Sequence, residues 1–233
     1  MYYKFDRGHT QLFWDDKDPK VRAQKLNDLL IRYFGEIDNG TFVEVGAHNG
    51  LDCGITPPLA DKGWNGLYIE ASPFWAQECA NNHKDNKNVK VMNVAIGDHR
   101  GTVTLHGSDA GATVSESYLK EVCAHVPWTG NHTSKKEIKM ITLEDALRAA
   151  KIKQGFEVLS VDVEGSEPEV FAGFRLDYWK PRLMMIEMLD AHPELKQFES
   201  HAKKYQALRE LYRANGYDEI FADEVNTVFA LRR

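Results

Sequence analysis

The sequence has few cysteines and no long apolar run, and each absence excludes a class of protein. The three cysteines, Cys53, Cys79 and Cys123, are widely separated and form no C-x-x-C pair. This pattern argues against a disulfide framework or a cysteine zinc site and favours a reducing compartment, so we expect a cytoplasmic protein. The most apolar stretch, Leu183–Leu189, is too short to span a bilayer and carries Glu187, so we expect no membrane span.

Concentrated positive charge is also missing. The chain has 29 Lys and Arg against 35 Asp and Glu, a net charge of −6, and its densest basic spots are the pairs Lys135-Lys136 and Lys203-Lys204. Binding to phosphates needs clustered basic side chains, so we expect no nucleic-acid partner. The nine histidines show no H-x-H or H-x-x-x-H spacing, and we therefore predict no metal centre.

What the chain does have is a regular alternation of strand and helix patterns. The expected strands are 41–46, 67–71, 89–96, 157–163 and 183–189, with a C-terminal hairpin of 217–222 and 227–231. The expected helices are 19–34, a short one after Thr56, 72–82, 142–151 and 202–214. Such alternation predicts an α/β fold with a mostly parallel sheet, helices on both faces and ligands at the carboxyl ends of the strands.

Helix starts carry their own signals. Thr56, Ser72 and Ser166 each precede a proline-containing first turn and are expected N-caps. Ser166 with Glu169 also has the spacing of a capping box.

The composition predicts a single domain over residues 1–233, with 1–40 as an N-terminal helical extension. Residues 101–106 alternate at period two and predict an additional strand. Residues 107–138 are irregular, apart from a short helix expected within 115–124. A segment of this length is typical of a lid or substrate loop, and a disordered insertion is the alternative.

The strongest motif is Glu44-Val45-Gly46-Ala47-His48-Asn49-Gly50, a strand that ends in a glycine turn. Such a turn lets the backbone approach a ligand closely and can present N–H donors to a carboxylate. Glu70, at the end of the second strand, can accept both hydroxyls of a ribose, so the pair predicts an adenosine cofactor. The alternative is that Glu44 and Glu70 are exposed strand-end acids.

The residue types favour S-adenosylmethionine over NAD as that cofactor. A dinucleotide site needs a second glycine two residues after the first, but here His48 occupies that position. Glu44 would repel a pyrophosphate and suits the cationic amino group of a methionine.

A second group of polar residues is Ser160-Val161-Asp162-Val163-Glu164. At period two, Ser160, Asp162 and Glu164 share one face near the end of a strand. The two carboxylates could orient the donor, bind an acceptor hydroxyl or act as a base. Two alternatives stay open: they receive helix N–H groups only, or they bind a divalent cation with Glu187 or Asp190.

Two histidines are further candidates. His132, in the irregular segment, and His192, after the fifth strand, are within the reach of an active site in this order of elements. We name His192 as a candidate catalytic base beside Asp162 and Glu164, the alternative being a surface histidine.

Four segments together resemble the FkbM-type methyltransferases in order and spacing: VEVGAHNG, GWNGLYIEASP, NVAIGD and VLSVDVEGSEPEVFAGF. The resemblance runs from about Gly40 to Glu187, and the last segment is its most specific part. It implies a Rossmann-like class I methyltransferase fold with a seven-stranded sheet, and S-adenosylmethionine as the donor.

The resemblance also implies roles for individual residues. Around the methionine part of the donor it places Glu44, Gly46, Ala47, Asn49 and Gly50. Glu70 would bind the ribose, Ala71 and Ser72 would border the adenosine, and the segment from Asn93 to Ile96, including Ala95, would lie by the adenine. Asp162 and Glu164 would face the reactive methyl.

Family members mostly methylate hydroxyls, so we expect O-methylation of a sugar or small metabolite, with a small-molecule or glycan acceptor. No N/D-P-P-Y turn, which amino-methyltransferases commonly carry, follows the fourth strand, where the chain reads Asp162-Val163-Glu164-Gly165. N- or C-methylation of a small molecule is the second reading. A donor-binding pseudoenzyme and, more remotely, an NAD-linked oxidoreductase are the others.

Overall fold

The computed structural model describes residues 19–52, 54–126, 131–190, 192, 194–195, 197–222 and 225–232. Its main element is a seven-stranded sheet with the order β3-β2-β1-β7-β8-β10-β9, parallel except that β10 is antiparallel to both of its neighbours. The strands are β1 (Thr41–Val45), β2 (Asn65–Glu70), β3 (Val89–Asn93), β7 (Val158–Val161), β8 (Leu183–Glu187), β9 (Tyr217–Ala222) and β10 (Asn226–Leu231). The expected α/β fold and its C-terminal hairpin are confirmed.

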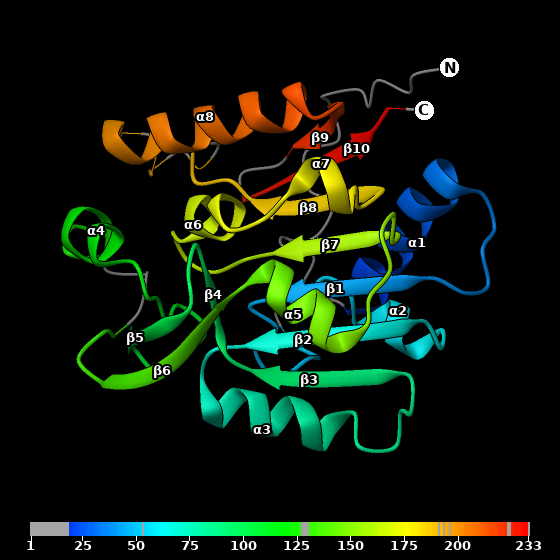
Figure 1. Cartoon of the computed structure of the whole chain (residues 1–233), viewed down its shortest axis with the longest axis horizontal. Helices are drawn as coiled ribbons and strands as arrows, with labels where there is room; N and C mark the ends of the chain where they lie inside the picture. Colours follow the sequence, from blue (N-terminus) through cyan, green and yellow to red (C-terminus); the bar gives the residue numbers. More distant parts are fainter. Residues whose placement is uncertain are drawn as a thin grey trace.

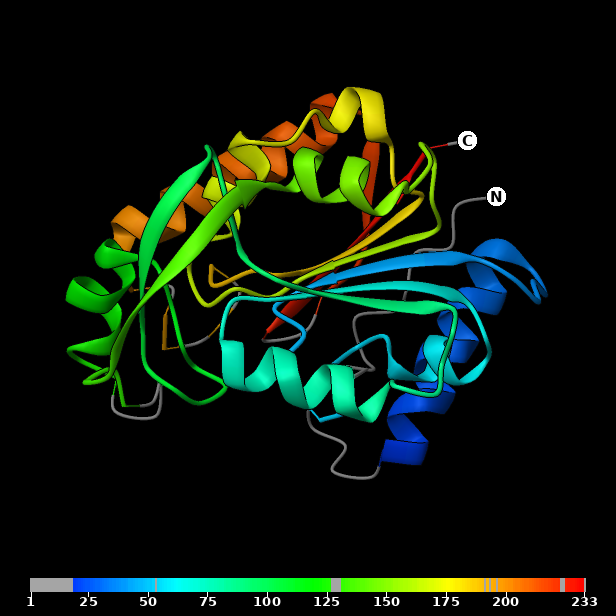
Figure 2. The same cartoon turned by 60° about the horizontal axis from the view of Figure 1, so that its bottom comes forward.

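Helices cover both faces of this sheet (Figures 1 and 2). One face carries α1 (Pro19–Phe34), α2 (Pro57–Asp61) and α3 (Pro73–Asn82), and the other carries α5 (Leu143–Ala150), α6 (Glu167–Ala172), α7 (Leu176–Trp179) and α8 (Glu199–Ala214). Successive side chains of a strand point to opposite faces, so Phe42 lies in one buried core and Val43 in the other. Among the described residues, no helix combines the length and the apolar character needed to cross a membrane.

A second, three-stranded sheet has the order β4-β6-β5, formed by β4 (Ala95–Gly97), β5 (Gly101–His106) and β6 (Lys135–Thr142). Figure 1 shows it beyond the carboxyl ends of β1, β2, β3 and β7. The expectation of one continuous strand over 89–96 is wrong, because the chain leaves the main sheet at Val94. The Asn93 side chain donates to the backbone oxygens of Glu70 and Ala71, at 2.8 and 3.0 Å, and fixes this exit.

The segment 107–138 is more regular than expected. The last residues of the segment, 135–138, begin strand β6. In this strand the alternating side chains of Ile138 and Met140 are buried on one face. The expected short helix is confirmed as α4 (Glu116–Tyr118) followed by a π-helical turn, η1 (Leu119–Cys123). Residues 127–130 of this segment and residues 1–18 of the expected N-terminal extension lie outside the described residues.

Thr56, Ser72 and Ser166 stand at the N-cap positions of α2, α3 and α6 as expected, but none of the three side chains bonds to its helix. The Thr56 hydroxyl donates instead to the Glu44 carboxylate at 2.6 Å. Ser166 has φ −112° and ψ 10°, outside the extended geometry of an N-cap, so the capping box with Glu169 does not form. Helix α8 begins at Glu199 rather than at 202, and α5 is capped by the Thr142 side chain, which accepts from the Asp145 N–H at 3.2 Å.

Candidate active site

The glycine turn after β1 is fitted tightly against the loop after β7. Gly46 has φ +86°, and a Cβ built there would lie 1.6 Å from the backbone oxygen of Asp162. The Asp162 N–H donates to the backbone oxygen of Val45 at 3.0 Å, so the two loops are joined directly. Only glycine fits this position, and its close approach brings the glycine turn and the Asp162 loop together.

Glu70, the last residue of β2, lies beside this turn. Its carboxylate accepts the backbone N–H groups of His48, at 2.8 Å, and Ser72, at 2.7 Å. Burial raises the pKa of Glu70 to about 7, although the N–H groups of Ser72 and His48 act in the opposite direction. The backbone therefore holds one carboxylate at the carboxyl end of the second strand.

Glu44 lies in the interior, on the other side of the turn. Only 3% of its surface is exposed, and its carboxylate accepts the Ile55 N–H and the Thr56 hydroxyl, at 2.8 and 2.6 Å. Burial raises its pKa to about 6. In this arrangement Glu44 fixes the start of α2.

A cavity of about 170 Å³ opens at the carboxyl ends of β1, β2 and β7. Polar groups at its wall include Glu70, Asp109, Asp162 and Glu164. The apolar part of the wall comes from both sheets and from the loop after β5: Val45, Ile69, Ala71, Val94, Ala95, Ile96, Leu105, Ala110, Ala112, Val114 and Val163. The site therefore lies between the two sheets, at the edge where a parallel α/β fold binds its ligands.

Aromatic rings close one side of this cavity. The rings of His48 and Trp75 have their centroids 3.7 Å apart, and both residues line the cavity. The Trp75 indole N–H donates to the backbone oxygen of Ser108 at 2.9 Å. Trp75 thus ties the loop that carries Asp109 and Ala110 to helix α3.

The loop after β7 holds two carboxylates at the opposite wall. Glu164 has φ +55°, an uncommon conformation for a residue with a side chain. The Thr113 hydroxyl donates to its backbone oxygen at 2.6 Å, and Gly165 packs against Tyr118, leaving no room for a Cβ. This strain is held by the surrounding structure, as is common at functional sites.

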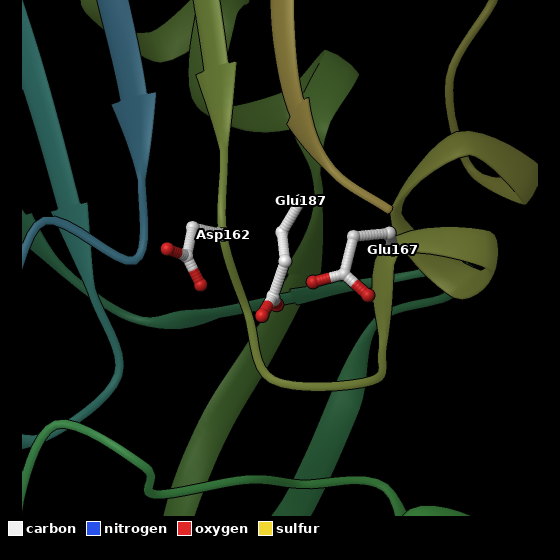
Figure 3. Close-up of side chains that lie close together, drawn as sticks. All are labelled: Asp162, Glu167 and Glu187. Atoms are coloured by element: carbon white, nitrogen blue, oxygen red, sulfur yellow. The ribbon is translucent and has the colours of Figure 1, made fainter. Parts of the chain in front are cut away.

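Asp162 and Glu164 belong to a larger acidic group. Burial, and then the neighbouring carboxylates of Asp162, Glu167 and Asp109, raises the pKa of Glu164 well above its usual range. Burial also raises the pKa of Asp162 to about 6 and that of Glu167 to about 7. Figure 3 shows Glu187, at the end of β8, between Asp162 and Glu167, the first residue of α6.

The sequence matches the model of one known protein family. The family model described as the methyltransferase FkbM domain matches residues 44–219, which include the glycine turn, Glu70 and the loop after β7. The chain belongs to this family. It is an S-adenosylmethionine-dependent methyltransferase.

Solved structures with the same fold are remote in sequence. An O-methyltransferase from Bacillus cereus, in complex with SAH, has 13% identity and a TM-score of 0.53, over 95% of this chain and 84% of that one. The O-methyltransferase TomG from Streptomyces achromogenes, in complex with SAM, has 11% identity and a TM-score of 0.50, over 91% and 80%. No curated protein matches the sequence.

The cavity of this FkbM-family methyltransferase includes seven of the site residues named from the sequence: Gly46, Glu70, Ala71, Ala95, Ile96, Asp162 and Glu164. Its lining does not include the other seven, which are Glu44, Ala47, Asn49, Gly50, Ser72, Asn93 and His192. Several of these shape the loops instead. The Asn49 side chain accepts the N–H groups of Leu51 and Asp52, and Gly50, at φ +71°, packs against Cys79 and His83. Direct donor contacts for the first six of these residues, and a catalytic role for His192, stay predictions.

The sequence pattern gives no site role to Asp109, which lines this cavity, or to Thr113, which holds the Glu164 backbone. Trp75 also lines the cavity, and its position just after the second strand is typical of a core or pocket-wall residue. Asp109 and Thr113 lie in the irregular segment, where no periodicity points to a cavity. From the sequence, Glu167 is only a residue within the expected capping box that begins at Ser166. In the structure, its carboxylate accepts the Val163 N–H at 2.8 Å and the Tyr205 hydroxyl.

Proposed function

We propose that this methyltransferase transfers the methyl group of S-adenosylmethionine to a hydroxyl oxygen of a sugar or other small metabolite. The observation that carries the proposal is the pairing of two carboxylates, Asp162 and Glu164, in the same cavity as the strand-end Glu70. Carboxylates accept hydrogen bonds, and a hydroxyl acceptor must give up a proton.

The donor would lie along the ends of β1 and β2. The Glu70 carboxylate would accept the ribose hydroxyls, and Ala95 and Ile96 of the second sheet would border the adenine. The glycine turn at Gly46 would hold the methionine part. Asp162 and Glu164, which line the wall after β7, would lie on the side of the reactive methyl.

The chemistry needs few protein groups. The carbon–sulfur bond to the methyl breaks as the carbon–oxygen bond to the acceptor forms, and the acceptor's proton passes to a carboxylate. The donor is already activated, so in-line positioning supplies much of the rate. Asp162 or Glu164 is in place to hold the acceptor hydroxyl and to receive its proton.

The loop 107–114 would form the acceptor side of the site. Asp109, Ala110, Ala112 and Val114 line the cavity, and Trp75 and Thr113 tie this loop to α3 and to the loop after β7. We propose that it is the substrate loop of a single domain. A cytoplasmic location is consistent with Cys79 and Cys123, which are present as thiols.

Donor binding can be tested by calorimetric titration with S-adenosylmethionine, S-adenosylhomocysteine and NAD. We expect both adenosyl ligands to bind, and the Glu70→Gln variant to bind at least tenfold more weakly. Glu78→Gln, on the adjacent helix α3 and outside the cavity lining, is the matched control and should bind like the wild type. Binding of NAD alone, or an unaltered affinity in Glu70→Gln, would overturn the assignment of the donor site.

Acceptor chemistry can be tested with a set of hydroxyl, amine and carbon acceptors and labelled donor. We expect label on hydroxyl acceptors, and a loss of at least a hundredfold in kcat/KM for Glu164→Gln without a matching loss in donor affinity. Glu169→Gln, on helix α6 and outside the cavity lining, should keep the wild-type rate. Donor binding without any turnover would instead indicate a pseudoenzyme.

A further inference from the structure

Three carboxylates from different elements converge beside the cavity. Asp162 follows β7, Glu167 begins α6 and Glu187 ends β8, and one oxygen of each lies within 4.8 Å of the others. Figure 3 shows the three side chains directed toward a common region. Oxygen ligands on opposite sides of a Mg²⁺ or Ca²⁺ ion are about 4 to 5 Å apart, twice the metal–oxygen distance, so this spacing suits a divalent cation.

The cluster lacks an obvious source of positive charge. Within the described part of the chain, no Lys, Arg or His forms an ion pair with Asp162, Glu167 or Glu187. Glu167 receives hydrogen bonds from the Val163 N–H and the Tyr205 hydroxyl, neither of which carries a positive charge. Burying several carboxylates together is costly unless a cation or protons neutralise them.

Glu187 supplies an independent observation. The residue is 8% exposed, and its Oε2 is buried without a hydrogen-bond partner. Buried polar atoms in folded proteins almost always have a partner, so an unpartnered carboxylate oxygen within an acidic cluster indicates a missing ligand. The Glu167 carboxylate is also oriented for binding a cation. Its hydrogen bonds fix the orientation of the group and leave lone pairs on both oxygens.

We propose that Asp162, Glu167 and Glu187 bind one divalent cation of the oxygen-preferring kind, Mg²⁺ or Mn²⁺. Carboxylates and water are the ligands these ions prefer, and three carboxylates leave positions for water or for a substrate oxygen. Asp162 lines the cavity, so the ion would lie at the acceptor side. Its role there rests on the proposed function: it would bind the acceptor oxygen and favour loss of the hydroxyl proton.

The competing arrangement is neutralisation by protons. Protons on Asp162 and Glu187 would offset the cost of burying the cluster without any cation. A cation that binds must displace those protons, whereas a cluster that keeps its protons binds no metal. Metal binding therefore separates the two arrangements.

The test is a titration of the full chain, freed of metal by a chelator, with MnCl₂, followed by the electron paramagnetic resonance signal of free Mn²⁺. We expect one bound Mn²⁺ per chain, displaced by excess Mg²⁺, and at least tenfold weaker binding to Glu187→Gln. Glu169→Gln is the matched control, since it removes a carboxylate of the same helix as Glu167 outside the cluster, and it should bind like the wild type. Absence of binding at millimolar Mn²⁺, or unaltered binding by Glu187→Gln, would overturn the proposal.

A second measurement covers the case in which the variant fails to fold. The wild-type melting temperature should rise with Mn²⁺ concentration, because a ligand of the native state stabilises it, and no rise would overturn the proposal. Neither measurement contains donor or acceptor. A failure here therefore leaves methyl transfer untouched, and a failure of methyl transfer leaves the cation site standing.

Discussion

The two walls of the cavity are built in different ways. At the donor wall, the turn at Gly46 and the carboxylate of Glu70 are fixed by backbone contacts between neighbouring parallel strands. At the acceptor wall, Glu164 is held by Thr113, which is far away in the sequence and belongs to the loop before α4. Contacts among the strand ends of the main sheet thus make one wall, and a contact from outside that sheet, from the loop before α4, holds the other. Substitutions in the donor wall should therefore cost the most stability. Substitutions in the acceptor wall should mainly alter the reaction with the acceptor.

The largest effect is expected from Gly46→Ala. The new Cβ would overlap the backbone oxygen of Asp162, at 1.6 Å, in a conformation with φ +86°. We expect the free energy of unfolding to fall by about 4 kcal/mol, as measured by urea denaturation. Gly155→Ala is the control: at φ +69° it has the same backbone strain but no atom within 4 Å, and it should cost about 1 kcal/mol. Equal losses in the two variants would contradict a close fit between the two loops.

The next effect concerns pH and the donor wall. The folded-state pKa of Glu70 is raised to about 7 from an ordinary value of 4.5, so the folded protein favours its neutral form. Its contribution to stability is therefore full below about pH 4.5 and is lost as the pH rises through about 7. In unfolding experiments at pH 5 and pH 8, this loss should be about 3 kcal/mol smaller in Glu70→Gln than in the wild type. Glu44, Asp162 and Glu167 also have raised pKa values and add losses of the same sign to both proteins. A Glu70→Gln profile parallel to that of the wild type would show that Glu70 does not titrate in this range.

Thr113→Val tests the acceptor wall. It removes the hydroxyl that donates to the Glu164 backbone oxygen and accepts the Ser115 N–H, so we expect a loss of about 2 kcal/mol in the free energy of unfolding. The donor affinity from calorimetry should stay within twofold of the wild type, while kcat/KM for the acceptor falls. A parallel loss of donor affinity would mean that the two walls are not separate.

The smallest effect is expected from Trp75→Phe. The variant keeps a ring against His48 but loses the indole N–H that donates to Ser108, at a cost below about 1 kcal/mol. Hydrogen exchange should become faster in residues 107–112 and stay unaltered in β1. Unaltered exchange in 107–112 would show that Trp75 does not hold this loop.

The donor wall could be predicted from the sequence because its signals are local. A strand that ends at Gly46 and a second that ends at Glu70 specify their places through periodicity and turn chemistry alone. Even here, the side-chain bonds of the N-caps could not be predicted: the Thr56 hydroxyl donates to Glu44, a contact between two elements that sequence spacing does not show.

The acceptor wall could be predicted only in part. Asp162 and Glu164 follow a clear strand pattern, but the second sheet depends on Asn93 turning the chain away from β2 and on β6 pairing with β4 and β5. Glu167 and Glu187 are separated in sequence by α6 and α7, and only the parallel neighbours β7 and β8 bring them together. Pairing of this kind is decided by tertiary packing, which periodicity does not encode.

The most direct measurement is transfer from S-adenosylmethionine carrying a ¹³C-labelled methyl group, with the product examined by NMR. A methyl carbon bonded to oxygen on a hydroxyl acceptor, lost in Glu164→Gln and kept in Glu169→Gln, is the predicted result. A methyl carbon bonded to nitrogen or carbon, or transfer that is equally fast in Glu164→Gln, would contradict the assignment of the acceptor wall.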